Sequence, residues 1–459
     1  MPLILGAQSA TGAAEVVTNS CRFDGSSDYL HKTLSSPGNR RKWTFSCWAK
    51  RCVQTGSDHI FGAPQNSSNY DQIYFAGTVF RFDHWISGSS AGSLVTDRVF
   101  RDPTAWYHIV CVWDSDNADA SLRMRLYVNG TEETSFSTDT NPSLNADSYV
   151  NSTSYPFEIG AMNTGEYYNG YLAEVVFIDG LALTASDFGE FDTDSPTIWK
   201  PKSVSGLTFG TNGFYLDFKD SANLGNDASG GTDFTEVNLA ATDQATDTPT
   251  NNFCTVDPLA SNAETYAEGN LKVDDLTGSS NTPGARSTMG VRKGKWYCEI
   301  KCTAVGASML MGICEETATM SILGDFQAMD GTLMYRNDGK SVYFPGGGSG
   351  ASYGDTYTSG DIIGIALDMD NRDVYFYKNG TIQNSGTAAF TSSNIVANTF
   401  YFPMQAGYNV GIAEYNFGGC ETFTIASGNA DANGYGNFEY AVPSGYLAMC
   451  TQNLGSDGG

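Results

Sequence analysis

The pattern of apolar and polar positions repeats every two residues in many short segments bounded by turn residues. In residues 41–51 (RKWTFSCWAKR), Trp43, Phe45 and Cys47 alternate with polar positions. Because successive side chains of a strand point to opposite faces, this period predicts a β-strand with one apolar face.

A second kind of segment is apolar at nearly every position. Residues 105–115 (AWYHIVCVWDS) are of this kind, and such a run predicts a strand covered on both faces. Residues 184–192 (TASDFGEFD) alone resemble a helical turn, with Thr184 or Ser186 as the expected cap.

Two hairpin signals occur in matching contexts. Asn129-Gly130 lies inside residues 122–136, and residues 374–381 (VYFYKNGT) end in the same Asn-Gly-Thr phrase. Asn-Gly strongly favours the two-residue turn of a β-hairpin. In both places a buried strand and an acidic turn come first, which predicts two sandwiches of one general design.

Many short strands with almost no helical period predict an all-β chain built from β-sandwiches. The length of 459 residues favours two to three domains. We therefore expect an arm at residues 1–20 and sandwiches at residues 21–200 and 285–459. Residues 201–284 are rich in Gly, Asn, Asp and Thr but keep recurring aromatic residues. They are expected to form an ordered connector that packs on both domains.

Charge and composition restrict the partners. The net charge of -26 repels phosphate backbones and anionic lipid, so we expect no nucleic-acid partner. No stretch approaches the ~20 apolar residues of a membrane span, so no membrane insertion is expected. Residues 1–20 contain no Lys or Arg, so no secretory signal is expected either.

The chain has 10 cysteines and no C-x-x-C pair. Cys47 and Cys111 fall inside apolar strand patterns, where a free thiol behaves as a small hydrophobe. We expect buried free thiols rather than zinc ligands, with disulfides only if the mature protein meets an oxidising environment.

The order of the aromatic strand phrases in the first sandwich resembles a laminin-G-like or concanavalin-A-like jelly roll. The phrases that carry the resemblance are DYL (28–30), KWTFSCWAKR (42–51), WYHIVCVWD (106–114), LYVNGT (126–131) and GYLAEVVFIDG (170–180).

The second sandwich resembles a SPRY domain. The resemblance lies in GKWYCEI (294–300), MGIC (311–314), GDIIGIALDMDNRDVYFYKNG (360–380) and YNFGG (415–419). Together the two resemblances imply a tandem of two concanavalin-A-like jelly-roll β-sandwiches joined by the ordered connector.

The chain as a whole resembles tail-fibre-like structural proteins of tailed bacteriophage virions. The phrases are MPLILGAQS at the start, FIDGLALTASDFGEFD before WKPK, and DTPTNNFCT. This resemblance implies a place on the virion surface, with other virion proteins and a host-surface glycan or protein as partners. It also implies a homo-oligomer, with a trimer favoured.

Glycosidases share this fold, so the relevant catalytic motif is a pair of carboxylates on one strand. The phrase E-x-D-x-E, which would place two carboxylates on one strand face, does not occur, and neither does G-x-S-x-G or a P-loop. We expect no catalytic residues and no enzyme activity.

Calcium is the one candidate cofactor. Asp114, Asp116 and Asp119 lie in an acidic turn (DSDNADA, 114–120) whose carboxylates suit Ca²⁺. The favoured alternative is an ordinary turn whose aspartates bind their own backbone.

Ligand binding is expected in loops at one end of a rigid sandwich, where aromatic rings stack on sugars and polar groups bind hydroxyls. In the SPRY-like half, a peptide is as plausible a ligand as a sugar. The candidate residues are His84, Trp85, Tyr167, Tyr168, Tyr335 and Arg336.

The leading hypothesis is therefore a phage virion surface protein that acts as a fibre-like adhesin for host attachment. The first alternative is a capsid or tail decoration protein with a purely structural role. The second is a polysaccharide depolymerase, which requires glycan cleavage.

Overall fold

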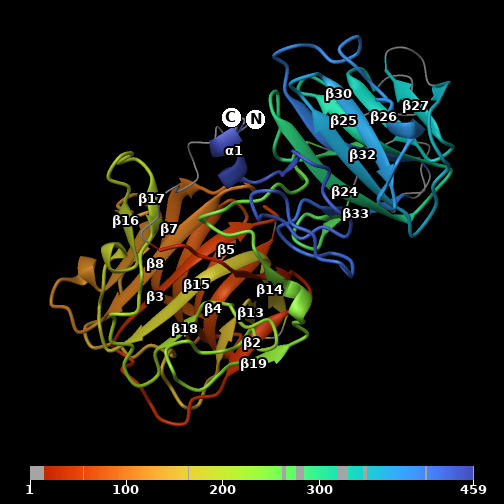
Figure 1. The fold of residues 1–459 in the computed structure, drawn as a ribbon. Helices are drawn as coiled ribbons and strands as arrows, with labels where there is room; N and C mark the ends of the chain where they lie inside the picture. The colour runs from red at the N-terminus through yellow and green to blue at the C-terminus, as the bar shows by residue number, and fades with distance from the viewer. Residues whose placement is uncertain are drawn as a thin grey trace. The chain divides into compact units, whose positions relative to one another are not determined.

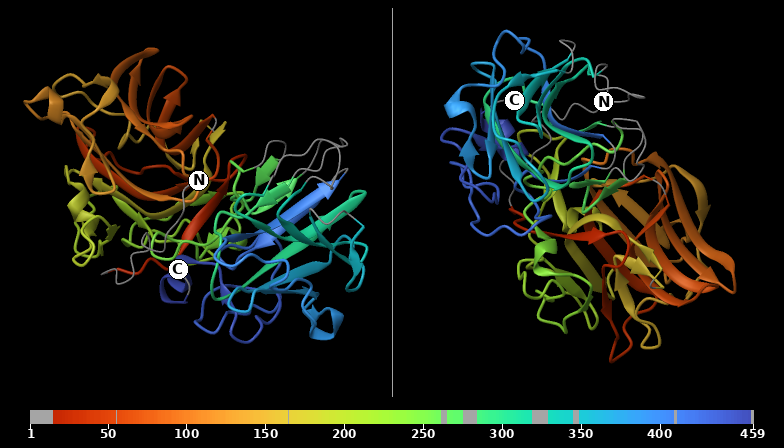
Figure 2. Two further views of the ribbon diagram at one scale, coloured as in Figure 1. Left: turned by 90° about the horizontal axis from the view of Figure 1, so that it is seen from above. Right: turned by 90° about the vertical axis from the view of Figure 1, so that its right-hand side faces the viewer.

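A computed structural model describes residues 15–54, 56–163, 165–260, 265–274, 284–318, 329–344, 349–408 and 411–457. The chain divides into two compact units, domain 1 up to Thr250 and domain 2 from Asn251 onward. Domain 1 runs from red to yellow-green in Figure 1 and domain 2 from green to blue, and Figure 2 gives two further views. Both domains are antiparallel β-structure, as predicted, and α1 (Thr451–Asp457) is the only α-helix in the described ranges. None of the described helices is long and apolar enough to cross a membrane.

Domain 1 has two large sheets. Sheet A runs in the order β10 (Thr131–Glu132), β9 (Met124–Val128), β8 (Trp106–Asp114), β3 (Lys42–Arg51), β15 (Asn169–Asp179), β1 (Ser20–Asp24) and β20 (Gln244–Ala245), with β18 (Phe214–Leu216) also on β15. Sheet B runs in the order β11 (Phe136–Thr140), β7 (Ser89–Val99), β6 (Val79–Ile86), β5 (Asn69–Ala76), β4 (Ser57–Asn66), β12 (Phe157–Ile159), β2 (Tyr29–Lys32) and β19 (Thr235–Val237).

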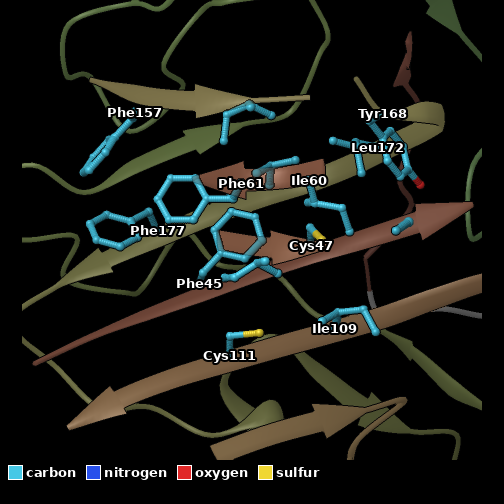
Figure 3. Packing of buried hydrophobic residues seen from close by; sticks show 14 of the residues in the cluster. Phe45, Cys47, Ile60, Phe61, Ile109, Cys111, Phe157, Tyr168, Leu172 and Phe177 are labelled. Carbon is cyan, nitrogen blue, oxygen red and sulfur yellow. The ribbon is translucent and has the colours of Figure 1, made fainter. Parts of the chain in front are cut away.

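The main core of domain 1 is rich in aromatic rings from both sheets (Figure 3). Phe45 of β3 stacks on Phe61 of β4 with ring centroids 4.7 Å apart. Cys47 lies two residues further along β3, and its side chain therefore faces the same core. The alternation seen in the sequence of β3 is thus the division between core and outer face.

Strand β8 is covered on both faces, as its continuous apolar run predicted. Ile109 and Cys111 point into the main core, whereas Val110 and Val112 join a second cluster on the outer face of sheet A. Trp199 packs against that second cluster.

Trp199 belongs to the small hairpin of β16 (Gly189–Phe191) and β17 (Trp199–Pro201). Its indole N–H donates to Nδ1 of buried His108 over 3.0 Å. Nε2 of that histidine therefore carries the ring proton and donates to Ser46 Oγ at 2.9 Å. This hydrogen-bonded chain fixes the hairpin on sheet A.

Both predicted Asn-Gly hairpins are present. Asn129 and Gly130 have φ of 48° and 80°, and Asn379 and Gly380 have φ of 48° and 76°. Positive φ at both central residues is the geometry that suits the twist of the flanking strands. The predicted helical turn is the 3-10 helix η3 (Ala185–Asp187), with Thr184 as its N-cap.

The predicted connector is divided between the two domains. Residues 201–250 supply β18, β19 and β20 to the sheets of domain 1. The described part of 251–284 supplies β21 (Thr265–Ala267) and β22 (Lys272–Asp274) to domain 2. Of the predicted arm at 1–20, residues 1–14 lie outside the described residues. Val17 packs on domain 1 next to Trp48, so the domain begins before residue 20.

Three buried ion pairs join residues 201–250 to the strands of domain 1. Lys50 Nζ lies 2.6 Å from Asp247 Oδ2. Arg22 pairs with Asp243 at 2.7 Å, and Lys32 pairs with Asp227 at 3.4 Å. A buried charge is tolerated only with a partner, so this segment completes the domain rather than covering it loosely.

Domain 2 also has two sheets. The first runs in the order β21, β22, β33 (Ile412–Asn416), β24 (Lys295–Ala304), β29 (Ile362–Asp368), β30 (Asp373–Lys378) and β31 (Thr381–Ile382), with β34 (Leu447–Ala448) on β24. The second runs in the order β23 (Gly284–Arg286), β32 (Tyr401–Tyr408), β25 (Ser308–Glu315), β26 (Thr332–Arg336), β27 (Lys340–Tyr343) and β28 (Ala351–Ser352).

Two buried carboxylates hold the irregular C-terminal segment on domain 2. Glu299 of β24 accepts hydrogen bonds from the backbone N–H groups of Glu439 and Tyr440 at 3.0 and 2.9 Å. Asp431 accepts from the N–H of Ala448 at 2.8 Å and from Nδ2 of Asn453 at 2.7 Å. The side chains thus supply acceptors that a sheet partner would otherwise supply.

All ten cysteines are free and buried, as expected. Burial raises the pKa of the Cys254 thiol to about 11 and that of Cys302 to about 12. Thiols in such surroundings act as core residues rather than as nucleophiles.

Candidate functional site

A cavity of about 450 Å³ opens on domain 1, on the side of sheet B that faces away from the core. Its floor comes from β4 and β5, and its wall comes from the hairpin of β13 (Ala161–Met162) and β14 (Glu166–Tyr167). Figure 1 labels these four strands near the middle of domain 1.

The alternation along β5 separates the cavity from the core. Ile73 and Phe75 point into the core, whereas Gln72 and Tyr74 line the cavity. The sequence DQIYF therefore places an amide and a phenol side by side on the outer face. His59 of β4 is the register partner of Tyr74, and their rings stack 4.5 Å apart at an angle of 5°.

Asp83 of β6 is the centre of a hydrogen-bond network beside this floor, because it is the register partner of Gln72. The carboxylate is fully buried and accepts from Ser93 Oγ at 2.5 Å and from Tyr74 Oη at 3.2 Å. Gln72 Nε2 donates to the carboxylate at 3.4 Å, and the Arg81 guanidinium lies 3.1 Å away. Such a network holds its members in one orientation.

The network orients His59. Because the Gln72 amide N–H group faces Asp83, its carbonyl oxygen faces His59, and Nε2 of His59 lies 3.1 Å from it. Nε2 is therefore a donor. Burial lowers the pKa of His59, and the carboxylate of Glu166 opposes that shift.

Glu166 stands at the rim of the cavity. Its side chain is 59% exposed, and Oε2 lies 3.4 Å from Nε2 of His59. Close packing of the hairpin on β4 sets this position. A Cβ added to Gly62 would lie 2.6 Å from Met162 Sδ, so the hairpin packs directly against this strand.

The hairpin is braced from within by Glu158 of β12. Its Oε2 accepts a hydrogen bond from the backbone N–H of Asn163 at 2.9 Å. Desolvation by burial raises the pKa of Glu158 to about 6. Asn163 lines the cavity next to the hairpin turn.

An aromatic pair flanks the cavity. Tyr70 lines it and stacks on Trp85 of β6, with ring centroids 5.9 Å apart and an angle of 22°. Both side chains are partly exposed. Partly exposed stacked rings of this kind are suitable surfaces for the apolar faces of sugars.

Three of the predicted ligand-binding residues are core residues, and we correct those predictions. His84 is fully buried, with Nδ1 at 2.5 Å from Asp71 Oδ1. Tyr168 is fully buried and donates to the carbonyl of Lys50 at 3.0 Å. Tyr335 is fully buried in domain 2. Because these side chains have no exposed surface, a ligand would not reach them.

The other three predicted residues remain near the surface. Trp85 stacks beside the cavity, and Tyr167 follows Glu166 on β14, where it faces Tyr29 at 6.3 Å. Arg336 of domain 2 forms an ion pair with Asp338 at 2.7 Å. A ligand role for these residues stays a prediction.

The three aspartates predicted for calcium point to separate partners. Asp114 Oδ1 lies 3.2 Å from Lys42 Nζ, and Asp116 lies 3.9 Å from Arg41. Asp119 caps η2 (Ala120–Leu122). Within the described ranges no three His, Cys, Asp or Glu side chains gather as a metal site. Calcium binding at this turn stays a prediction.

Sequence reasoning did not find the cavity. His59, Gln72, Tyr74 and Glu166 come from two neighbouring strands and a hairpin about a hundred residues later. The local signal was the alternation of Gln72 and Tyr74 with core residues. Their meeting with Glu166 depends on long-range pairing through β12, which no local pattern encodes.

Comparison with known families finds one match in each domain. Residues 24–187 match the model of the concanavalin A-like lectin/glucanases superfamily, of the laminin G type. Residues 295–416 match the SPRY domain. The chain thus contains a concanavalin-A-like domain followed by a SPRY domain.

Individual relatives share only parts of the chain. Over 176 residues this chain is 33% identical to the ATP-dependent RNA helicase Ddx1 of Drosophila melanogaster. The aligned segment covers 36% of this chain and 19% of the helicase. The chain thus spans less than a fifth of that relative's length.

Two solved structures show partial likeness. The SPRY domain of human HERC1 matches with 18% identity and a TM-score of 0.29, covering 37% of this chain and 99% of that domain. A candidate carbohydrate binding protein from Bacteroides ovatus matches with 14% identity and a TM-score of 0.32, covering 49% of this chain and 60% of the other. The assignment of the two domains rests on the family models.

Proposed function

We propose that this protein is an adhesin whose first domain binds a glycan in the cavity on sheet B. The observation that carries the proposal is the cavity itself, which the partly exposed stacked rings of Tyr70 and Trp85 flank and whose floor holds the oriented amide of Gln72. Sugars are bound by rings that stack on C–H faces and by fixed polar groups that bind hydroxyls.

The size and preorganisation of the cavity support the same function. Its volume of about 450 Å³ lies within the usual range for small-ligand sites. The buried Asp83 network fixes the floor before any ligand arrives, and binding therefore requires little ordering of these side chains. The lectin-type family match of domain 1 agrees with this use.

The test is glycan binding by the whole purified chain, first on a glycan array and then by titration of the strongest ligand. Gln72→Leu removes the oriented amide, and we expect it to weaken binding by about tenfold or more. The matched control is Gln244→Leu, because Gln244 donates to the Phe218 carbonyl and does not line the cavity. Equal binding by both variants would overturn the assignment of the cavity.

We further propose that the adhesin is displayed on the surface of a tailed-phage particle, as the sequence phrases imply. Other virion proteins would be its assembly partners and a host envelope glycan or protein its ligand. Cryo-electron microscopy of the intact particle would test this by locating density for the chain. If the chain is present in the particle but binds no host surface, the structural decoration role would be favoured. Cleavage of the bound glycan would favour the depolymerase.

A further inference from the structure

We propose that the cavity selects sugars by charge, preferring a sugar with an ammonium group over a neutral one and a neutral one over an acidic one, with Glu166 as the selecting residue. The inference rests on the proposed glycan-binding function and names the chemical class of its ligand.

The charges around the cavity leave one negative charge in excess. No Lys or Arg is among the described residues that line the cavity. The Arg81 guanidinium lies outside the lining and is neutralised by Asp83 at 3.1 Å. Glu166 at the rim faces His59 at 3.4 Å, and that histidine is only 1% exposed. A buried imidazole favours its neutral form, so His59 does not supply a counter-charge.

Glu166 also has the exposure that recognition requires. With 59% of its side chain exposed, the carboxylate can meet an incoming ligand at the rim, 3.4 Å from His59. A bound carboxylate or sulfate would meet this charge without a compensating cation, and like charges brought together at a binding site oppose binding. A bound ammonium would complete the ion pair.

The effect is expected to be moderate because the pair is partly exposed to solvent. We expect steps of about five- to tenfold in Kd between the amino, neutral and acidic forms of one sugar ring, decreasing as salt is added. The Asp83 network would contribute equally to all three forms, since they share the same ring and hydroxyl groups.

The experiment titrates the whole chain with glucosamine, glucose and glucuronate, and with the corresponding galactose series, by NMR at pH 6 and low salt. The wild type should follow the order amino, neutral, acidic. Glu166→Gln should bring the three affinities together, and Glu166→Lys should reverse the order. Glu132→Lys makes the same change of charge on β10 of the other sheet and should leave the order unchanged.

The outcomes separate this inference from the function on which it rests. Suppose that the wild type binds sugars and that Gln72→Leu weakens this binding. Equal affinity of the wild type for the three forms, or an unchanged order of affinities in Glu166→Lys, would then overturn the charge selection alone. Binding of none of these sugars, together with no binding on the array, would overturn the glycan-binding function as well.

Discussion

Nζ of Lys50 lies 2.6 Å from Oδ2 of Asp247, and both side chains are almost fully buried in domain 1. The two residues are 197 positions apart in the sequence. Lys50 belongs to the central strand β3, whereas Asp247 follows β20 at the end of the domain. The ion pair thus joins the centre of sheet A to the last residues of the domain.

Replacing one partner of this pair should destabilise domain 1. We expect Asp247→Asn to lower the free energy of unfolding by about 3 kcal/mol, because it leaves a buried ammonium without its counter-charge. Urea unfolding followed by tryptophan fluorescence would measure this. Asp147→Asn is the control, since Asp147 pairs with Arg41 at the exposed surface. A loss no larger than that of the control would contradict the proposed role of the pair.

Glu174 should make domain 1 less stable as the pH rises. Burial raises its pKa from 4.5 to about 7, and Tyr215 Oη donates to it at 2.7 Å. The folded chain holds this proton more tightly than the unfolded chain. The contribution to stability is therefore present below pH 4.5 and is lost as the pH rises through about 7.

The variant Glu174→Gln keeps the neutral form at every pH. We expect it to be more stable than the wild type by about 1 to 3 kcal/mol at pH 8 and equal to it at pH 4. Urea unfolding at both pH values measures the difference, and Glu132→Gln on exposed β10 is the control. A difference that does not depend on pH would contradict the assignment.

His108 should remain neutral in mildly acidic solution. Burial lowers its pKa to about 3, and the hydrogen bonds to Trp199 and Ser46 require the form with the proton on Nε2. The unfolded imidazole takes up a proton below pH 6.5, so this contribution to stability decreases as the pH falls from about 6.5 toward 3.

NMR of the imidazole nitrogens tests this directly. At pH 5 the spectrum of His108 should show the neutral ring with the proton on Nε2. Trp199→Phe removes the indole donor and should abolish the preference for that form. Nitrogen chemical shifts of a protonated imidazole at pH 5 in the wild type would contradict the prediction that His108 stays neutral.

Asp431 should control local opening at the end of domain 2. We expect Asp431→Ala to speed amide exchange around Ala448 by about tenfold, since the hydrogen bonds that Ala448 and Asn453 donate to this carboxylate are lost. Asp370→Ala is the control, because it removes an acceptor for Gly294 in the same domain. Exchange measured by mass spectrometry should change near Ala448 only in the first variant.

The strands of both sandwiches could be predicted from sequence because their signals are local. The bounds of β3 and β8 match the predicted phrases, and the Asn-Gly turns have the expected backbone angles. Residues 201–250 could not be assigned, because their strands are two or three residues long and owe their place to pairing with distant strands.

Individual ligand residues were harder to predict than strands. His84 and Trp85 are neighbours in sequence, yet His84 is buried in the core and Trp85 stacks on Tyr70 at the surface. Alternation gives two faces but does not say which face carries a cavity. That depends on the hairpin containing Glu166, which β12 brings next to β4.

The buried ion pairs between residues 201–250 and the strands of domain 1 determine which segment of the chain can be transferred to another protein as a folded unit. A fragment that stops at residue 187, where the family match ends, would leave Arg22, Lys32 and Lys50 without their acidic partners. Such a fragment should aggregate or fail to fold. Recombination that exchanges domain 1 intact must therefore cut near Thr250, and the exchangeable unit is longer than the segment that matches the family.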